Sequence, residues 1–193
     1  MKLSLACLAT FLLPGTLAQL NMSQTQNAIG MITTETFQIE TALNTLSTNA
    51  TLSEVLDMAQ GLVMNLTTTM DLLQGVTKEI IVSPVPEWQD LIVLAYLAFV
   101  EVNTDFFTAL SSKHSIFAQF RVTWPIEAVL CKLWPRMDAL ADALKIMLPR
   151  DANSVSYFEE QLNTVVNGTI ATYQEWCVPS RRYPGVMPKC ATV

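Results

Sequence analysis

An unbroken apolar run, LIVLAYLAFV at residues 91–100, constrains this chain more than any other feature. Eight of its side chains are large, and burying each is worth at least about 1.5 kcal/mol, so roughly 12 kcal/mol depends on keeping the run out of water. This rivals the whole stability of a typical domain, about 5 to 15 kcal/mol. A membrane span needs about 20 apolar residues, about twice the length of this run, so the run is too short to cross a bilayer. The run therefore predicts a helix covered by neighbouring helices.

The first eighteen residues, MKLSLACLATFLLPGTLA, have the features of a secretory signal peptide: Lys2, an apolar stretch to Leu13 and a Pro-Gly break. We expect residues 1–18 to be removed, leaving a helical domain at 19–176 and an extended tail at 177–193. Loss of Lys2 changes the net charge from −6 to −7, with 10 basic and 17 acidic residues. This charge disfavours non-specific attraction to nucleic acid or anionic lipid. The predicted location is extracellular or in a cell wall.

Four N-glycosylation sequons agree with a secreted glycoprotein, and they begin at Asn21, Asn49, Asn65 and Asn167. Three cysteines follow the predicted signal peptide: Cys131, Cys177 and Cys190. An odd number in an oxidising compartment predicts one disulfide and one further thiol, whose fate the sequence leaves open. We favour a Cys177–Cys190 disulfide, because the Pro- and Gly-containing segment between them can turn back on itself.

Apolar residues at helical spacing predict an all-α bundle of about five amphipathic helices with a Pro- and Cys-containing C-terminal tail. The helices are expected at about 24–47, 51–81, 87–112, 125–148 and 154–173, the third being central. Capping boxes are predicted at Thr51–Glu54 and Ser156–Glu159, and a kink at Pro135. The buried stripe of the fourth helix comprises Ile126, Leu130, Leu133, Met137, Leu140, Leu144 and Met147.

Residues that would support catalysis are scarce. The single histidine, His114, lies in the polar stretch SSKHS, where a solvated loop histidine is expected. Asp138 and Asp142 are interpreted as part of a solvated helix face. The four tryptophans share no period and are interpreted as core and helix-end packing residues. No hydrolase, metalloprotease or nucleotide-binding motif occurs, so we predict neither an enzyme nor a cofactor or metal site.

Short helical words in the second half of the chain allow a comparison with a known family. These are DFFTALSSKHSIF from residue 105, DALADALKIMLP from residue 138 and IATYQ from residue 170, with TTETFQIETALNTL and SPVPEWQD before them. Over residues 24–175 the chain resembles the fungal hydrophobic surface-binding proteins and cell-wall galactomannoproteins. Pro135 and the Cys-bearing tail depart from that family's pattern.

The resemblance implies a secreted, non-enzymatic protein that binds apolar surfaces or holds fatty acids between helices. We expect the third and fourth helices to line the site, through Leu91, Leu94, Ala98, Phe99, Leu130, Leu133, Met137 and Leu140. Fatty acids are the expected ligands, with cell-wall polysaccharide as a further partner and without a transmembrane segment. Two alternatives stay open: a structural cell-wall mannoprotein without a small ligand, and a secreted helical effector. Cleavage of the tail at Arg181-Arg182 is also left open.

Overall fold

The computed structural model describes residues 22–80 and 89–191, and within these ranges the chain forms five helices and one short hairpin. The helices are α1 (Met22–Asn44), α2 (Leu52–Glu79), α3 (Gln89–Gln119), α4 (Thr123–Met147) and α5 (Ala152–Tyr173). The strands β1 (Trp176–Val178) and β2 (Lys189–Ala191) pair antiparallel. The predicted all-helical bundle is confirmed. The predicted signal peptide, the sequon at Asn21 and the SPVPEW segment lie outside the described residues.

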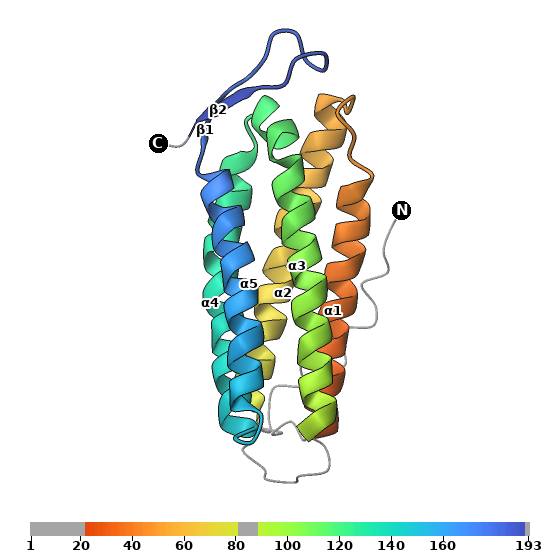
Figure 1. The fold of residues 1–193 in the computed structure, drawn as a ribbon. Helices are drawn as coiled ribbons and strands as arrows, with labels where there is room; N and C mark the ends of the chain where they lie inside the picture. The colour runs from red at the N-terminus through yellow and green to blue at the C-terminus, as the bar shows by residue number, and fades with distance from the viewer. Residues whose placement is uncertain (1–21, 81–88, 192–193) are drawn as a thin grey trace.

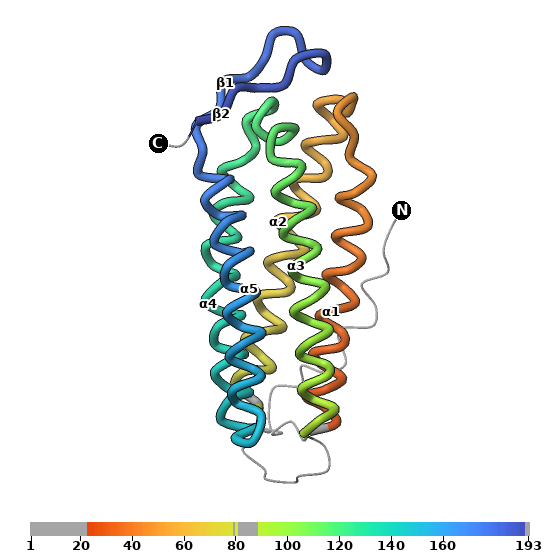
Figure 2. The backbone as a smooth tube through the Cα atoms, in the orientation of Figure 1, coloured from red at the N-terminus to blue at the C-terminus, as the bar shows by residue number. Residues whose placement is uncertain are grey.

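The helices pack side by side as an elongated bundle, with the hairpin projecting beyond one end (Figure 1). α1 packs chiefly against α3, α3 against α5, α5 against α4, and α4 against α2. The helices thus follow the order α1–α3–α5–α4–α2 around the bundle. The α1–α2 seam closes this ring, and it is packed more sparsely than the other four seams. The tube view shows the same arrangement (Figure 2).

The buried stripes of α1 and α4 follow the sequence periodicity. In α1, Ile29, Ile32, Thr36, Ile39 and Leu43 are all buried. The seven residues predicted for α4 are also buried, because each recurs on the same face after two turns. α4 continues as a helix through Pro135.

The apolar run is shared between the core and the surface of α3. Ile92, Tyr96, Phe99 and Val100 are at most 3% exposed, and they continue into a buried series along the helix. Within the described ranges α3 alone has the length and hydropathy of a membrane-crossing helix, with a mean hydropathy of 1.5. A helix that packs in a protein core meets the same criteria of length and hydropathy. Because α3 packs against both α1 and α5, its apolar character is explained by the bundle.

Helix boundaries differ from the sequence prediction at two places. α3 extends to Gln119, so SSKHS is helical and His114 is buried, at 5% exposure, rather than in a solvated loop. α5 begins at Ala152, so Ser156 lies inside the helix and cannot be its N-cap. The capping box of α2 is confirmed: Thr51 and Glu54 exchange side-chain and backbone hydrogen bonds.

Candidate functional site

A groove of about 650 Å³ opens at the sparse seam, where α1 turns into α2. Ligand sites in proteins commonly have volumes of about 300 to 1,000 Å³. Its floor is apolar and is formed by Ile39, Leu46, Ala50, Met58 and Leu62. The groove therefore reaches the edge of the apolar core.

Small residues keep this groove open. Ala42 from α1 and Gly61 from α2 both line it. A Cβ atom added at Gly61 would meet no atom within 4 Å, so the space beside this glycine is empty. A larger residue at either position would narrow the gap between the two helices.

The rim of the groove is polar and acidic. Asn49, Glu54, Asp57 and Asn65 line it, and all four are exposed. Hydrogen bonds from the Thr51 backbone N–H and then from its hydroxyl hold the pKa of Glu54 below its ordinary value, which keeps this carboxylate charged. None of the described residues lining the groove is Lys or Arg. The rim thus offers hydrogen bonds and negative charge. One cation lies beside the floor: Lys113 of α3 donates from Nζ to the carbonyl of Leu46 at 2.8 Å.

The eight residues predicted to line a lipid site do not share one surface. Phe99, Leu130, Leu133, Met137 and Leu140 are at most 2% exposed and belong to the core. Residues this inaccessible leave no gap of water size beside them. α3 and α4 also contact each other little, because α5 lies between them on one side of the ring.

The other three predicted residues face solvent. Leu91 is 40% exposed, Leu94 is 59% exposed, and Ala98 is also exposed. An acyl chain that entered the core would not reach them in this arrangement. The sequence could not separate these faces, because the run is apolar on all sides of α3.

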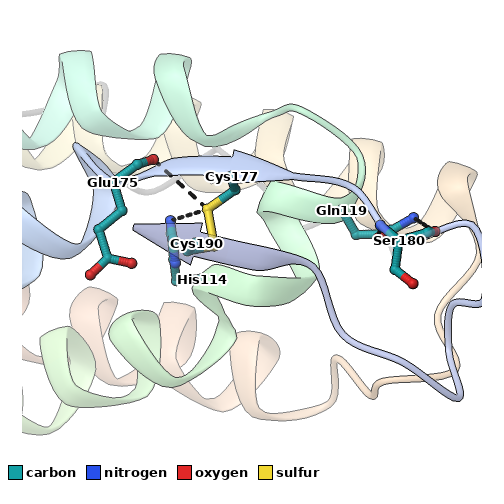
Figure 3. The surroundings of a disulfide bond; sticks show 6 residues. All are labelled: His114, Gln119, Glu175, Cys177, Ser180 and Cys190. Atoms are coloured by element: carbon teal, nitrogen blue, oxygen red, sulfur yellow. Dashed lines mark hydrogen bonds between the residues drawn. A yellow bond between two sulfur atoms is a disulfide. The ribbon is translucent and has the colours of Figure 1, made fainter. Parts of the chain in front are cut away.

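A disulfide joins Cys177 and Cys190 across the hairpin, as predicted, and Cys131 on α4 is a free, exposed cysteine. His114 Nε2 lies 3.9 Å from Cys177 Sγ (Figure 3). Glu175 approaches the same sulfurs, so the ligand atoms of these four residues lie within 4.8 Å of one another. Both sulfurs are held in the disulfide, which leaves His114 and Glu175 as potential ligands. Two are too few for a zinc site, which usually takes three or four protein ligands.

Buried aromatic contacts fix the position of His114. Its ring packs edge-on against Tyr173, with ring centroids 5.0 Å apart, and the Tyr173 hydroxyl donates to the Leu110 carbonyl at 3.0 Å. Burial lowers the pKa of His114, while the negative charge of Glu175 acts in the opposite direction. The imidazole is therefore held in its neutral form by the fold.

We expect this histidine to make the protein less stable in mild acid. The unfolded state takes up a proton near the ordinary pKa of 6.5, whereas the folded state takes it up only at lower pH. The His114 contribution to stability is complete above that value and is lost as pH falls towards the folded-state pKa. Urea unfolding should show the free energy of unfolding falling between about pH 7 and 5. His114→Gln should make the free energy of unfolding depend less steeply on pH. An unchanged slope in the variant would contradict the assignment.

Lys145 of α4 forms ion pairs with one carboxylate of its own helix and with one of α5. Lys145 Nζ lies 2.7 Å from Asp142 and 2.9 Å from Glu159 of α5. The Asp142 side chain is 68% exposed, in agreement with the predicted solvated face. Asp138 is only half-buried, but its Oδ1 atom is enclosed and has no hydrogen-bond partner among the described residues. The Lys145–Glu159 pair ties α4 to α5.

Comparison with known proteins gives a likeness in structure but none in sequence. No protein-family model matches the chain, and no curated protein matches it in sequence. A crystal structure of AfMP4p in complex with palmitic acid matches with a TM-score of 0.64, over 79% of this chain and 99% of that chain. The two proteins share a fold. Their sequences are 15% identical, so the likeness concerns the fold and not the residues of a site.

Proposed function

We propose that this protein is a secreted, non-enzymatic binder of single acyl chains, which it holds between its helices. The observation that carries the proposal is the α1–α2 groove, an apolar floor under the least tightly packed seam of the bundle. AfMP4p, which shares the fold, was crystallised with palmitic acid. The hydrocarbon part of such a ligand suits the apolar floor of the groove.

The energetics allow useful affinity. A sixteen-carbon chain has about 14 methylenes, which at about 0.8 kcal/mol each gives roughly 11 kcal/mol on full burial. Association costs at least about 4 kcal/mol, which leaves about 7 kcal/mol, or a dissociation constant of about ten micromolar. A shorter chain or partial burial would bind more weakly.

The chain would enter at the groove and extend between α2 and α4 towards the predicted residues Leu130, Leu133, Met137 and Leu140. α2 packs directly against α4, so a guest that passes Leu62 of the groove floor meets the α4 stripe next. These side chains fill their space in the empty protein, so the guest must displace some of them.

The head group would stay at the acidic rim. Glu54 and Asp57 repel a fatty-acid carboxylate, whereas Asn49 and Asn65 can donate hydrogen bonds to a hydroxyl or ester. We infer that affinity comes from the hydrocarbon and that uncharged heads are tolerated at least as well as acids.

A homologous ligand series tests this function. Competition of fatty acids and their methyl esters against a fluorescent fatty acid should show affinity rising about fourfold per added methylene. The methyl ester should bind at least as tightly as the acid of the same length. Affinity that does not depend on chain length, or no saturable binding of any member, would rule the function out.

A structural cell-wall mannoprotein is the second candidate, because the centre of the bundle is fully packed: Phe99 and Leu140 are 0% exposed. The exposed Asn49, Asn65 and Asn167 are available as glycan sites on such a scaffold. Glycans at Asn49 and Asn65 would also flank the groove. This candidate would be favoured if the protein is retained in the cell wall and a fatty-acid titration shows no saturable binding.

A further inference from the structure

The C-terminal hairpin presents one face to the bundle and the other to solvent. Strand pairing aligns Trp176 with Ala191, Cys177 with Cys190, and Val178 with Lys189. Because side chains alternate along a strand, the disulfide lies on the face that meets His114. Trp176, Val178 and Lys189 then share the outer face, where Trp176 and Val178 also border a hollow of about 450 Å³ beside Arg121 of the α3–α4 turn.

This outer face is unusually apolar for an exposed surface. Trp176 is 65% exposed, Val178 is 46% exposed, and Val186 in the connecting loop is 45% exposed. Trp176 was expected to pack in the core or at a helix end, and it does not. A tryptophan left open on a small projecting element is typical of a surface that contacts something else.

Charge separates the hairpin from the bundle. Residues 176–193 contain Arg181, Arg182 and Lys189 and no acidic residue, a charge of +3. Residues 19–175 contain 7 basic and 17 acidic residues, a charge of −10. The negative charge that would repel anionic lipid therefore lies in the bundle, whereas the hairpin is positively charged.

Several contacts hold the hairpin in place. Gln119 at the end of α3 donates to the Ser180 carbonyl at 2.9 Å and accepts from the Ser180 backbone N–H at 2.8 Å (Figure 3). Tyr183 packs edge-on against Phe120, with ring centroids 5.5 Å apart. Together with the disulfide, these contacts hold the hairpin against the end of α3.

We propose that this hairpin docks the protein on membranes whose surface carries anionic phospholipid. Tryptophan prefers the interfacial zone of a bilayer, and each nearby cation is attracted to an anionic surface. The acidic bundle would be repelled, so the protein would stand end-on with the hairpin at the lipid. The α1–α2 turn lies at the same end of the bundle, so the groove would open close to that surface (Figure 1).

A second copy of the chain is a less suitable partner, although its acidic bundle is also complementary in charge. A stable protein interface buries about 800 Å² on each side. Three exposed apolar side chains on a short hairpin supply little of this area. A bilayer needs no matching surface and accepts a small basic and aromatic tip.

Vesicle flotation of the secreted protein tests the docking. Vesicles of phosphatidylcholine with about one third phosphatidylserine should bind it at low salt, whereas pure phosphatidylcholine vesicles or high salt should release it. Arg181→Gln with Arg182→Gln should lower the partition coefficient about 25-fold, since each cation near the surface contributes about fivefold. Trp176→Ala should reduce binding and abolish the blue shift of tryptophan fluorescence on vesicles.

Matched substitutions elsewhere provide the controls. Lys132→Gln with Arg136→Gln removes the same charge from exposed positions on α4, and Tyr157→Ala removes an exposed aromatic ring from α5. Both should bind vesicles within about twofold of the native protein. Equal losses in control and hairpin variants, or equal binding to both vesicle types, would overturn the proposal. If the protein does not bind vesicles but forms a concentration-dependent dimer, and the hairpin variants are monomeric, the face would instead bind a second copy of the chain.

This surface is separate from the acyl-chain groove. The hairpin variants should still bind fatty acid normally, and a groove variant should still float with anionic vesicles. If one proposal fails, the other can therefore still be tested.

Discussion

Replacing Gly61 with leucine is expected to lower acyl-chain affinity by more than about tenfold while leaving the bundle at least as stable. A Cβ at this position meets no atom within 4 Å, so the new side chain would extend into the groove without clashing. Excluding only two methylenes of the guest costs about 1.6 kcal/mol, which exceeds a tenfold change. Leucine also favours the helix over glycine by up to about 1 kcal/mol. Fluorescent fatty-acid titration and urea unfolding measure the two effects.

Gly30→Leu is the matched control for this change. Gly30 is also a helical glycine with no atom within 4 Å of an added Cβ, but it lies on an exposed face of α1 outside the groove. Its affinity for fatty acid should stay the same while stability rises by a similar amount. Normal binding by Gly61→Leu would show that the groove is not the entry site.

Truncating Leu133 to alanine is expected to destabilise the protein by about 3 kcal/mol. Leu133 is 1% exposed in the packed α4 core, and the loss of a buried leucine combines the transfer free energy with a residual cavity. A saturating acyl ligand should then stabilise the variant more than it stabilises the native protein, because the chain can fill the vacated volume. Urea unfolding with and without ligand measures both quantities.

The control for this truncation is Leu94→Ala, at a leucine 59% exposed on α3. Its effect should stay within about 0.5 kcal/mol, because little apolar surface changes its environment. A cost below about 1 kcal/mol at Leu133 would instead mean that α4 borders an open tunnel and that the guest needs no side-chain displacement.

The helices of this fold could be predicted because their stripes are long and regular. In α4 seven residues spaced by three or four predicted the buried face, and the structure buries all seven. The Thr51–Glu54 capping box marked the start of α2 to within one residue. The disulfide could be favoured because its cysteines flank a short turn-forming segment.

Tertiary context decided the features that the sequence did not predict. His114 has polar neighbours in the chain, yet Tyr173 of a distant helix covers it. Leu91 and Leu94 sit on a helix that is apolar all round, so only packing against α1 and α5 distinguishes its faces. The groove depends on which two helices close the ring, which no local pattern specifies. Gly61 in the middle of α2 weakens the helix without a local reason, but so does Gly75 of the same helix, so the sequence did not single out the groove.

The disulfide of the hairpin bridges a separation of 13 residues, all of them beyond the last helix. A cross-link restricts the unfolded chain only within the loop that it closes, so its contribution remains local to the tip. The five helices owe their cohesion to buried side chains and not to a covalent tether. Reducing agents would therefore loosen the projecting end selectively, and should weaken the proposed docking while leaving the proposed acyl-chain binding intact, without any change in sequence.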